Sequence, residues 1–174
     1  FASVLLIALA LGVQSLFNLR AMRDETQVIY ERELLGISHL KEANVNLIYI
    51  GRSLRRMILA PDVESRVRAR QEIAKARETL ASELVAARRA VLRKENIARL
   101  DNFEVNLARY DMRVAQAINM VEKSPYASGE AAAYVSSADF TADADKADAL
   151  LSEIARNKET GARESAERAM TVYR

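Results

Sequence analysis

The chain has 174 residues, of which 50% are hydrophobic, 29% charged and 6% aromatic, with 5 Gly, 2 Pro and no Cys. The lack of cysteine excludes disulfides and thiolate metal sites, and the scarcity of helix breakers favours one domain built from a few long helices. A net charge of +2 is weak support at most for a nucleic-acid partner, so none is expected.

The first predicted element is one long helix over residues 1–59, which opens with the apolar run FASVLLIALALGVQSLFNL. A membrane-spanning helix needs about 20 apolar residues, and this run already begins at the first residue. We therefore expect residues 1–19 to be the C-terminal part of a transmembrane helix and the chain to be part of a longer protein. A cleaved signal peptide or a buried core helix is the alternative, but no cleavage site and no equally apolar partner segment follows.

From residue 20 the helix becomes amphipathic, and it is predicted to end at residue 59. Its apolar residues recur every three or four positions, which is typical of a seam between nearly parallel helices: Leu40, Ala43, Leu47, Ile50, Leu54 and Met57. Pro61 cannot continue a helix, and Asp62 is suited to cap the next one.

Three further helices are predicted, over residues 63–91, 95–123 and 130–174. Their seams are Ile73, Ala76, Leu80, Leu84, Ala87 and Val91; then Leu100, Phe103, Leu107, Tyr110, Val114, Ala117 and Val121; then Phe140, Ala144, Ala147, Leu151 and Ile154. Residues 20–174 are therefore expected to form an all-α, antiparallel up-down-up-down four-helix bundle with long first and fourth helices. The first helix would be continuous with the transmembrane helix, and the fourth would return to the membrane.

No recognisable catalytic or metal-binding set is present. The only histidine, His39, lies in mid-helix without a nucleophile motif nearby, and we expect it to be a surface or packing residue. The acidic residues Asp139, Asp143, Asp145 and Asp148 share one helix, but the Glu-x-x-His pairs of a di-metal bundle are missing, so a solvated face is expected. The sequence therefore predicts no enzyme, no cofactor and no metal site.

A second stripe on the first helix faces away from the seam. It carries Val45, Ile48 and Tyr49 before it turns to Arg52 and Arg56. Apolar residues on the outer face of a bundle indicate a contact with another subunit, and along a twofold axis the stripe would meet itself. We therefore predict a homodimer interface through Val45, Ile48, Tyr49 and Arg52.

This dimer would bring arginines from two subunits together. The guanidinium groups would repel their symmetry mates unless an anion lay between them. They belong to Arg52, Arg55 and Arg56, and Tyr49 lies beside them. Arginine binds carboxylates through paired hydrogen bonds, so a small di- or tricarboxylate is the predicted ligand. In the alternative interpretation these arginines cover the distal end of the bundle or pair with glutamates on neighbouring helices.

Later helices offer further candidate ligand-binding residues. Tyr110 and Arg113 lie on the third helix, and Tyr134 and Thr141 lie near the start of the fourth, level with the arginines in an antiparallel bundle. Their hydroxyl and guanidinium groups would complete a carboxylate site. The alternative is that they are solvated or ordinary first-turn residues.

With these segments in view, the whole chain resembles the periplasmic four-helix-bundle ligand-binding domain of bacterial methyl-accepting chemotaxis proteins. The segment GRSLRRMIL, residues 51–59, is similar to the Arg-x-x-x-Arg segment of the aspartate-type receptors, and LLSEIARNK, residues 150–158, is similar to their descending fourth helix. The resemblance implies a receptor in the inner membrane with this domain in the periplasm or outside the cell. It also implies coupling to a kinase complex through segments outside these 174 residues.

On that match Arg52 and Arg56 fall on the two arginines that hold the ligand's carboxylates across the dimer interface. The family's third arginine is replaced by Leu47, and the Tyr, Gln and Thr of its helix-four segment have no clean counterpart. An organic acid without an amine, such as succinate, malate or citrate, is therefore favoured over an amino acid. The alternatives are the sensor of a histidine kinase or another transmembrane signalling protein, and a structural or partner-docking bundle without a small ligand.

Overall fold

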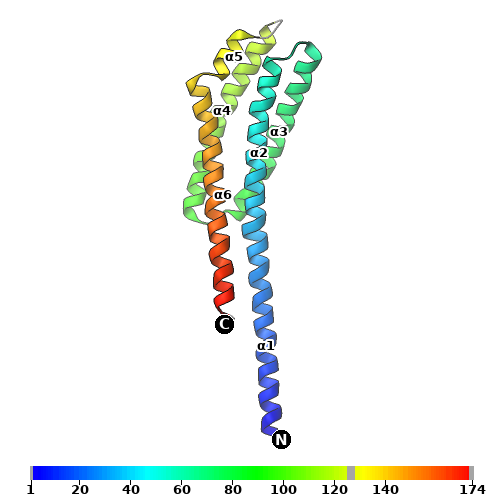
Figure 1. Cartoon of the computed structure of the whole chain (residues 1–174), viewed down its shortest axis with the longest axis vertical. Helices are drawn as coiled ribbons and strands as arrows, with labels where there is room; N and C mark the ends of the chain where they lie inside the picture. Colours follow the sequence, from blue (N-terminus) through cyan, green and yellow to red (C-terminus); the bar gives the residue numbers. More distant parts are fainter. Residues whose placement is uncertain (1, 125–127, 173–174) are drawn as a thin grey trace.

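The computed structural model describes residues 2–124 and 128–172, and every regular element within them is helical (Figure 1). The elements are α1 (Ala2–Val28), the π-helix η1 (Ile29–Leu34), α2 (Leu35–Ile58), α3 (Val63–Ala90), α4 (Lys94–Lys123), α5 (Gly129–Val135) and α6 (Ala138–Val172). The prediction of an all-α chain is confirmed.

Four long segments run side by side and form the bundle (Figure 1). α2 packs against α3 and α6, and α4 packs against α6. The chain ascends α2, descends α3, ascends α4 and descends α6, so the up-down-up-down order is confirmed. We call the end with the α2–α3 turn and α5 the distal end, and the end from which α1 projects the basal end.

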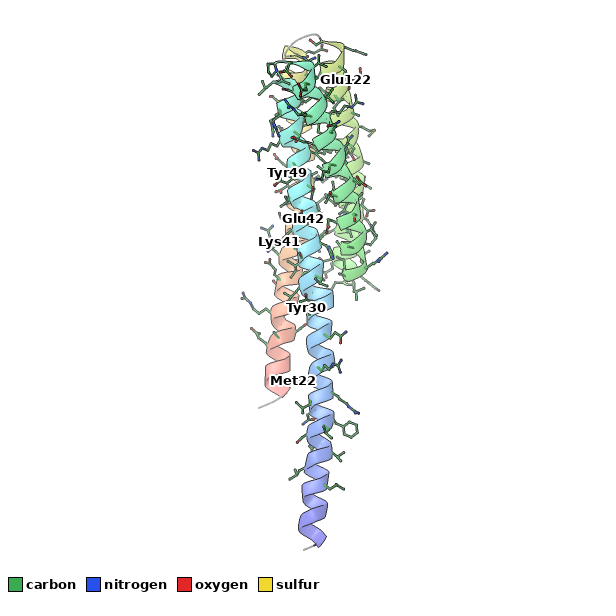
Figure 2. The ribbon with its side chains drawn as sticks, turned by 90° about the vertical axis from the view of Figure 1, so that its right-hand side faces the viewer. Met22, Tyr30, Lys41, Glu42, Tyr49 and Glu122 are labelled. Atoms are coloured by element: carbon green, nitrogen blue, oxygen red, sulfur yellow. The ribbon has the colours of Figure 1, made fainter. Side chains whose placement is uncertain are left out.

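The first predicted helix is one continuous rod, but it is not α-helical throughout. The six residues of η1 form a wider π-helical segment between α1 and α2, which the seam pattern gave no reason to expect. α1 projects beyond the bundle, and its Leu9, Leu16 and Phe17 are more than 60% exposed (Figure 2). None of the helices in the described ranges combines the length and apolarity of a membrane span. The transmembrane assignment of residues 1–19 stays a prediction.

The breaks between the first three helices lie where the sequence placed them. Asp62 caps α3, since its Oδ1 accepts a hydrogen bond of 2.7 Å from the backbone N–H of Ser65. This bond and the proximity of Arg68 lower the pKa of the Asp62 carboxyl. α3 ends at Ala90 and α4 begins at Lys94, each within one residue of the expected boundary.

The fourth predicted helix, over residues 130–174, is wrong as a single element. α5 ends at Val135, Ser136 and Ser137 interrupt the helix, and α6 begins at Ala138. The Oγ of Ser137 accepts a hydrogen bond of 3.4 Å from the N–H of Phe140, in the manner of a helix cap. Serine side chains compete for backbone hydrogen bonds, so two in succession end one helix and start the next. Residues 173 and 174 lie outside the described residues.

The predicted seams form the hydrophobic core. Every seam residue of α2 and α3 is less than 9% exposed, and so are those of α4 except the partly buried Leu107. In α6 the seam residues Phe140, Ala147 and Leu151 are buried, and Ala144 is partly buried. At the distal end the Phe140 ring packs edge-to-face on Tyr110, with 5.5 Å between ring centroids. Burial of each large apolar side chain contributes about 1.5–3 kcal/mol, so this core holds the arginine-bearing turns of α2 in place.

Candidate functional site

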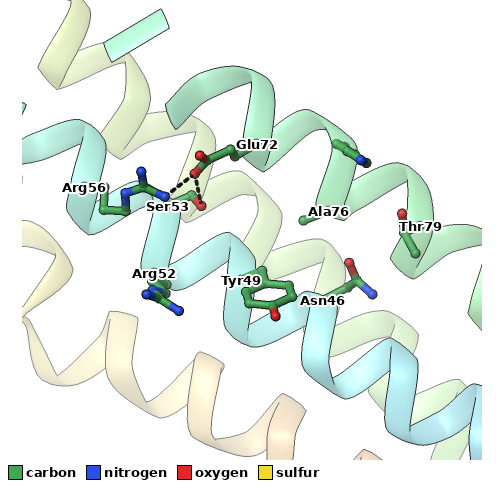
Figure 3. A pocket seen from close by; sticks show the side chains of 9 residues that line it. Asn46, Tyr49, Arg52, Ser53, Arg56, Glu72, Ala76 and Thr79 are labelled. Atoms are coloured by element: carbon green, nitrogen blue, oxygen red, sulfur yellow. Dashed lines mark hydrogen bonds and ion pairs between the residues drawn. The ribbon is translucent and has the colours of Figure 1, made fainter. Parts of the chain in front are cut away.

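A surface groove lies between α2 and α3 in the distal half of the bundle (Figure 3). Its volume is about 370 Å³, which is within the range of small-molecule sites. The residues that line this α2–α3 groove are Asn46, Tyr49, Arg52, Ser53, Arg56, Glu72, Lys75, Ala76 and Thr79.

Helical spacing explains why α2 presents these side chains together. Tyr49, Arg52 and Arg56 are separated by three and four positions, so they lie along one face of the helix. The buried Ser53 lies on the inner side of that face. On α3 the small side chain of Ala76 leaves room at the floor of the groove (Figure 3).

Glu72 of α3 neutralises one of the two arginines. Its Oε2 accepts hydrogen bonds from Arg56 Nη1 at 2.7 Å and from Ser53 Oγ at 2.9 Å (Figure 3). Arg56 is thus paired with a glutamate on a neighbouring helix, as the alternative interpretation expected. Arg52 and Lys75 form no ion pair with any carboxylate in the described part of the chain. Three cationic side chains therefore face one carboxylate, and the groove is positively charged.

A second groove of about 360 Å³ lies on the other side of α2, against α6. Arg55, Tyr110 and Thr141 line this α2–α6 groove, so the structure separates them from Arg52 and Arg56. Asp145 and Asp148 also line it and outnumber its single arginine. The Thr141 hydroxyl donates to backbone carbonyls of its own helix end, at 3.0 Å to Ala138. These features fit an anion less well than the α2–α3 groove does.

Tyr110 forms part of the core beneath the α2–α6 groove. It is 2% exposed, and its Oη lies 3.2 Å from the position that a Cβ on Gly51 would occupy. Burial raises the pKa of Tyr110 to about 12. The phenol is therefore neutral at physiological pH and lies against the backbone of α2.

Arg113 and Tyr134 belong to a third cluster, between α4, α5 and α6. Arg113 Nε donates to Asp143 Oδ2 at 2.6 Å, and Tyr134 Oη donates to Gln116 Oε1 at 2.9 Å. Hydrogen bonds to Asp143 and Tyr134 raise the pKa of Arg113 above its usual value. The structure brings neither residue to the α2–α3 groove.

Asp143 itself is 9% exposed. The expectation that the whole acidic string is a solvated face is therefore wrong at this position. The described residues contain no group of three or more His, Cys, Asp or Glu side chains that would hold a metal ion. His39 is a packing residue between helices, since its Nδ1 lies 2.6 Å from Glu83 Oε2 on α3.

The predicted dimer stripe lies on the surface of the subunit. Val45, Ile48 and Tyr49 are 39%, 56% and 47% exposed, and Arg52 is exposed beside them. Tyr49 is visible on the face of α2 in Figure 2. Exposed apolar side chains that lie together on a surface are typical of a contact with another molecule. The dimer itself stays a prediction.

Sequence reasoning missed the residues that α3 contributes, namely Glu72, Lys75 and Thr79. The signal was present in the tight turn at Pro61, which fixes the antiparallel register of α2 and α3. That register places Glu72 opposite Arg56 and Lys75 on the wall of the same groove.

Comparison with known proteins gives one match. Residues 1–173 match a family described as a four helix bundle sensory module for signal transduction. No curated protein and no solved structure matches the chain.

Proposed function

The chain belongs to the family of four-helix-bundle sensory modules for signal transduction, and on this premise we propose that it senses a small organic acid in the α2–α3 groove. The observation that carries the proposal is the pair of cations, Arg52 and Lys75, which line a groove of suitable volume and have no carboxylate partner among the described residues. Small-molecule sites are concave and carry a few polar groups that fix the ligand, and cationic groups in such a site suit an anion.

The chemistry of the groove favours a dicarboxylate. Arg52 can hold one carboxylate through two parallel hydrogen bonds, and Lys75 can hold a second as a point charge. The hydroxyl of Thr79 and the amide of Asn46 add neutral hydrogen-bonding groups at the wall. A tricarboxylate would place its third negative group close to Glu72, which already accepts from Arg56. Succinate and malate are therefore better candidates than citrate.

A homodimer would complete the site. The exposed stripe of Val45, Ile48 and Tyr49 borders the groove, and a twofold contact through it would bring Arg52 of both subunits close to the ligand. An anion between the subunits would then offset the repulsion between the two guanidinium groups.

The response to the ligand would pass along α6. This helix runs without a break from the level of the grooves to the basal end of the bundle (Figure 1). A ligand that prefers one position of α6 would shift the population toward that position. In this proposal residues 1–19 anchor the domain in the inner membrane, the bundle lies outside the cell, and a kinase complex is reached through segments outside these 174 residues.

The family is one of sensory modules rather than of enzymes, and we propose no catalytic role and no cofactor. A bundle that docks a partner protein and takes no small ligand is the second candidate. The exposed apolar residues on α2 favour it as much as they favour a dimer. A ligand screen separates the two candidates.

Thermal unfolding in the presence of organic acids and amino acids tests the proposal. A dicarboxylate at 100 times its Kd should raise the Tm by roughly 5–10 °C, whereas amino acids should have little effect. Arg52→Ala should reduce the shift at the same ligand concentration to about half or less. Either the absence of a shift with every acid, or a shift of unchanged size in Arg52→Ala, would contradict the proposed site.

A further inference from the structure

A buried lysine joins three elements at the basal end of the bundle. Lys158 of α6 is 5% exposed, and its Nζ donates to Glu33 Oε2 of η1 at 2.9 Å. The same Nζ donates to the backbone carbonyl of Ala90, the last residue of α3, also at 2.9 Å. One ammonium group thus ties α6 to η1 and to the end of α3.

The stem of this lysine has little freedom. A Cβ added to Gly36 would lie 2.6 Å from Lys158 Cε and 2.7 Å from the Cβ of Ala90. Real atoms do not approach so closely, so only glycine at position 36 leaves space for the lysine between α2 and α3. The position of Nζ is therefore set by packing as well as by its two acceptors.

Other polar links also join the first rod to α6. Asn44 Nδ2 on α2 donates to Asp148 Oδ1 at 2.7 Å in a partly buried contact. Lys41 and Glu159 lie 2.7 Å apart, but their side chains are 62% and 47% exposed, and exposed ion pairs add little stability. A buried ammonium must keep its acceptors, because water cannot replace them without opening the interface. In the described part of the chain, Lys158–Glu33 is thus the more deeply buried of the ion pairs between the rod and α6.

We propose that Lys158, Glu33 and the Ala90 carbonyl form a latch that holds α6 in one position relative to η1 and α3. Helix shifts in signalling proteins are about 1–2 Å, which is enough to draw a 2.9 Å contact beyond hydrogen-bond range. A shift of α6 by that amount along the rod would therefore break the latch. The π-helical η1 supports a switching role, because π segments inside α-helices occur frequently at functional sites. This proposal rests on the sensory family and not on the α2–α3 groove.

The test measures the position of α6 in the whole 174-residue chain, held in detergent micelles. The chain has no cysteine, so Ser38→Cys on α2 and Arg163→Cys on α6 allow spin labels at two chosen sites. Lys158→Met should broaden or shift the distance distribution between these labels while the helical content is kept. Lys146→Met is the matched control, since Lys146 is exposed on the same helix, and it should leave the distribution unchanged.

A second variant separates the latch from general loosening of the bundle. Gly36→Ala keeps the lysine but removes its space, so it should also broaden or shift the α2–α6 distance distribution. Labels at Gln71→Cys on α3 and Asn119→Cys on α4 should report no change in either variant. The latch is contradicted if folded Lys158→Met gives the same α2–α6 distance distribution as Lys146→Met, or if Gly36→Ala leaves that distribution unchanged. It is also contradicted if the distance between the labels at positions 71 and 119 changes as much as the α2–α6 distance does. If Lys158→Met does not fold, the α2–α6 distance in Gly36→Ala, compared with that in the wild type, decides whether the latch exists.

Discussion

Two grooves of similar volume lie on either side of α2, and their charges are opposite. On the α3 side, Arg52, Arg56 and Lys75 face the single carboxylate of Glu72. On the α6 side, Arg55 faces the two carboxylates of Asp145 and Asp148. The same two turns of α2 thus contribute arginine to both grooves, and the neighbouring helix decides which groove suits an anion.

The turn of the α-helix explains how adjacent arginines are separated. At 100° per residue, Arg56 is rotated about 40° from Arg52 in one direction, and Arg55 about 60° in the other. Arg56 therefore faces α3, Arg55 faces α6, and Arg52 lies between them on the outer face. This central position leaves Arg52 without an ion-pair partner among the residues that the structure describes, and it places Arg52 next to the predicted dimer stripe.

The largest expected effect is on ligand affinity. Arg52→Ala should weaken binding of the preferred dicarboxylate by about 10- to 100-fold, because a hydrogen bond to a charged group contributes about 1.5–3 kcal/mol. Arg55→Ala is the matched control on the opposite side of α2, and it should change the affinity less than twofold. Isothermal titration calorimetry of both variants measures the difference. If Arg55→Ala proves the more damaging, the two grooves have been assigned the wrong way round.

The next effect concerns stability at high pH and tests whether the floor of the α2–α6 groove is closed. The pKa of Tyr110 is raised to about 12 by burial, whereas an unfolded tyrosine titrates near 10. Between these values only the unfolded chain loses the proton, so the free energy of unfolding should fall by about 1.4 kcal/mol per pH unit above pH 10. The stabilisation from the neutral phenol is complete below pH 10.

Urea unfolding at pH 9 and pH 11 checks this linkage. In Tyr110→Phe the loss of stability between the two pH values should be smaller than in the wild type. Tyr49→Phe is the control, because Tyr49 is 47% exposed in the other groove, and it should behave as the wild type does. Equal losses in the wild type and Tyr110→Phe would mean that water reaches the Tyr110 hydroxyl.

The smallest effect sharpens the role of Glu72. Glu72→Gln removes the negative charge that neutralises Arg56 but keeps an oxygen acceptor for it. The groove becomes more positive, so dicarboxylate affinity should rise about 3- to 10-fold at low salt. Glu78→Gln, on the same helix but outside the groove, should have no effect. Weaker binding in Glu72→Gln would show that Glu72 assists the ligand rather than competing with it.

The sequence was sufficient to predict the bundle, because heptad spacing directly reports which face of each helix is buried. The helix breaks at Pro61 and near Val91 were also recoverable from turn chemistry and length. The break at Ser136 and Ser137 was not predicted, because no Gly or Pro marks that position. The π-helix was not predicted, because the spacing of apolar residues does not distinguish it from an α-helix; η1 contacts α6 and α3 in the fold.

The candidate site was less predictable for a physical reason. Helical spacing correctly placed Tyr49, Arg52 and Arg56 on one face, but it gives no information about the partners of a charged side chain. The pairing of Arg56 with Glu72 and of Arg113 with Asp143 depends on helix register and rotation. Residues expected to form one site are therefore distributed among two grooves and one structural cluster.

The most direct test of the central claim is a crystal structure of the chain grown with the dicarboxylate that gives the largest thermal shift. We expect the ligand in the α2–α3 groove, with one carboxylate within hydrogen-bonding distance of Arg52 and the other near Lys75. Ligand density in the α2–α6 groove beside Arg55, or an empty α2–α3 groove at saturating ligand, would contradict the account.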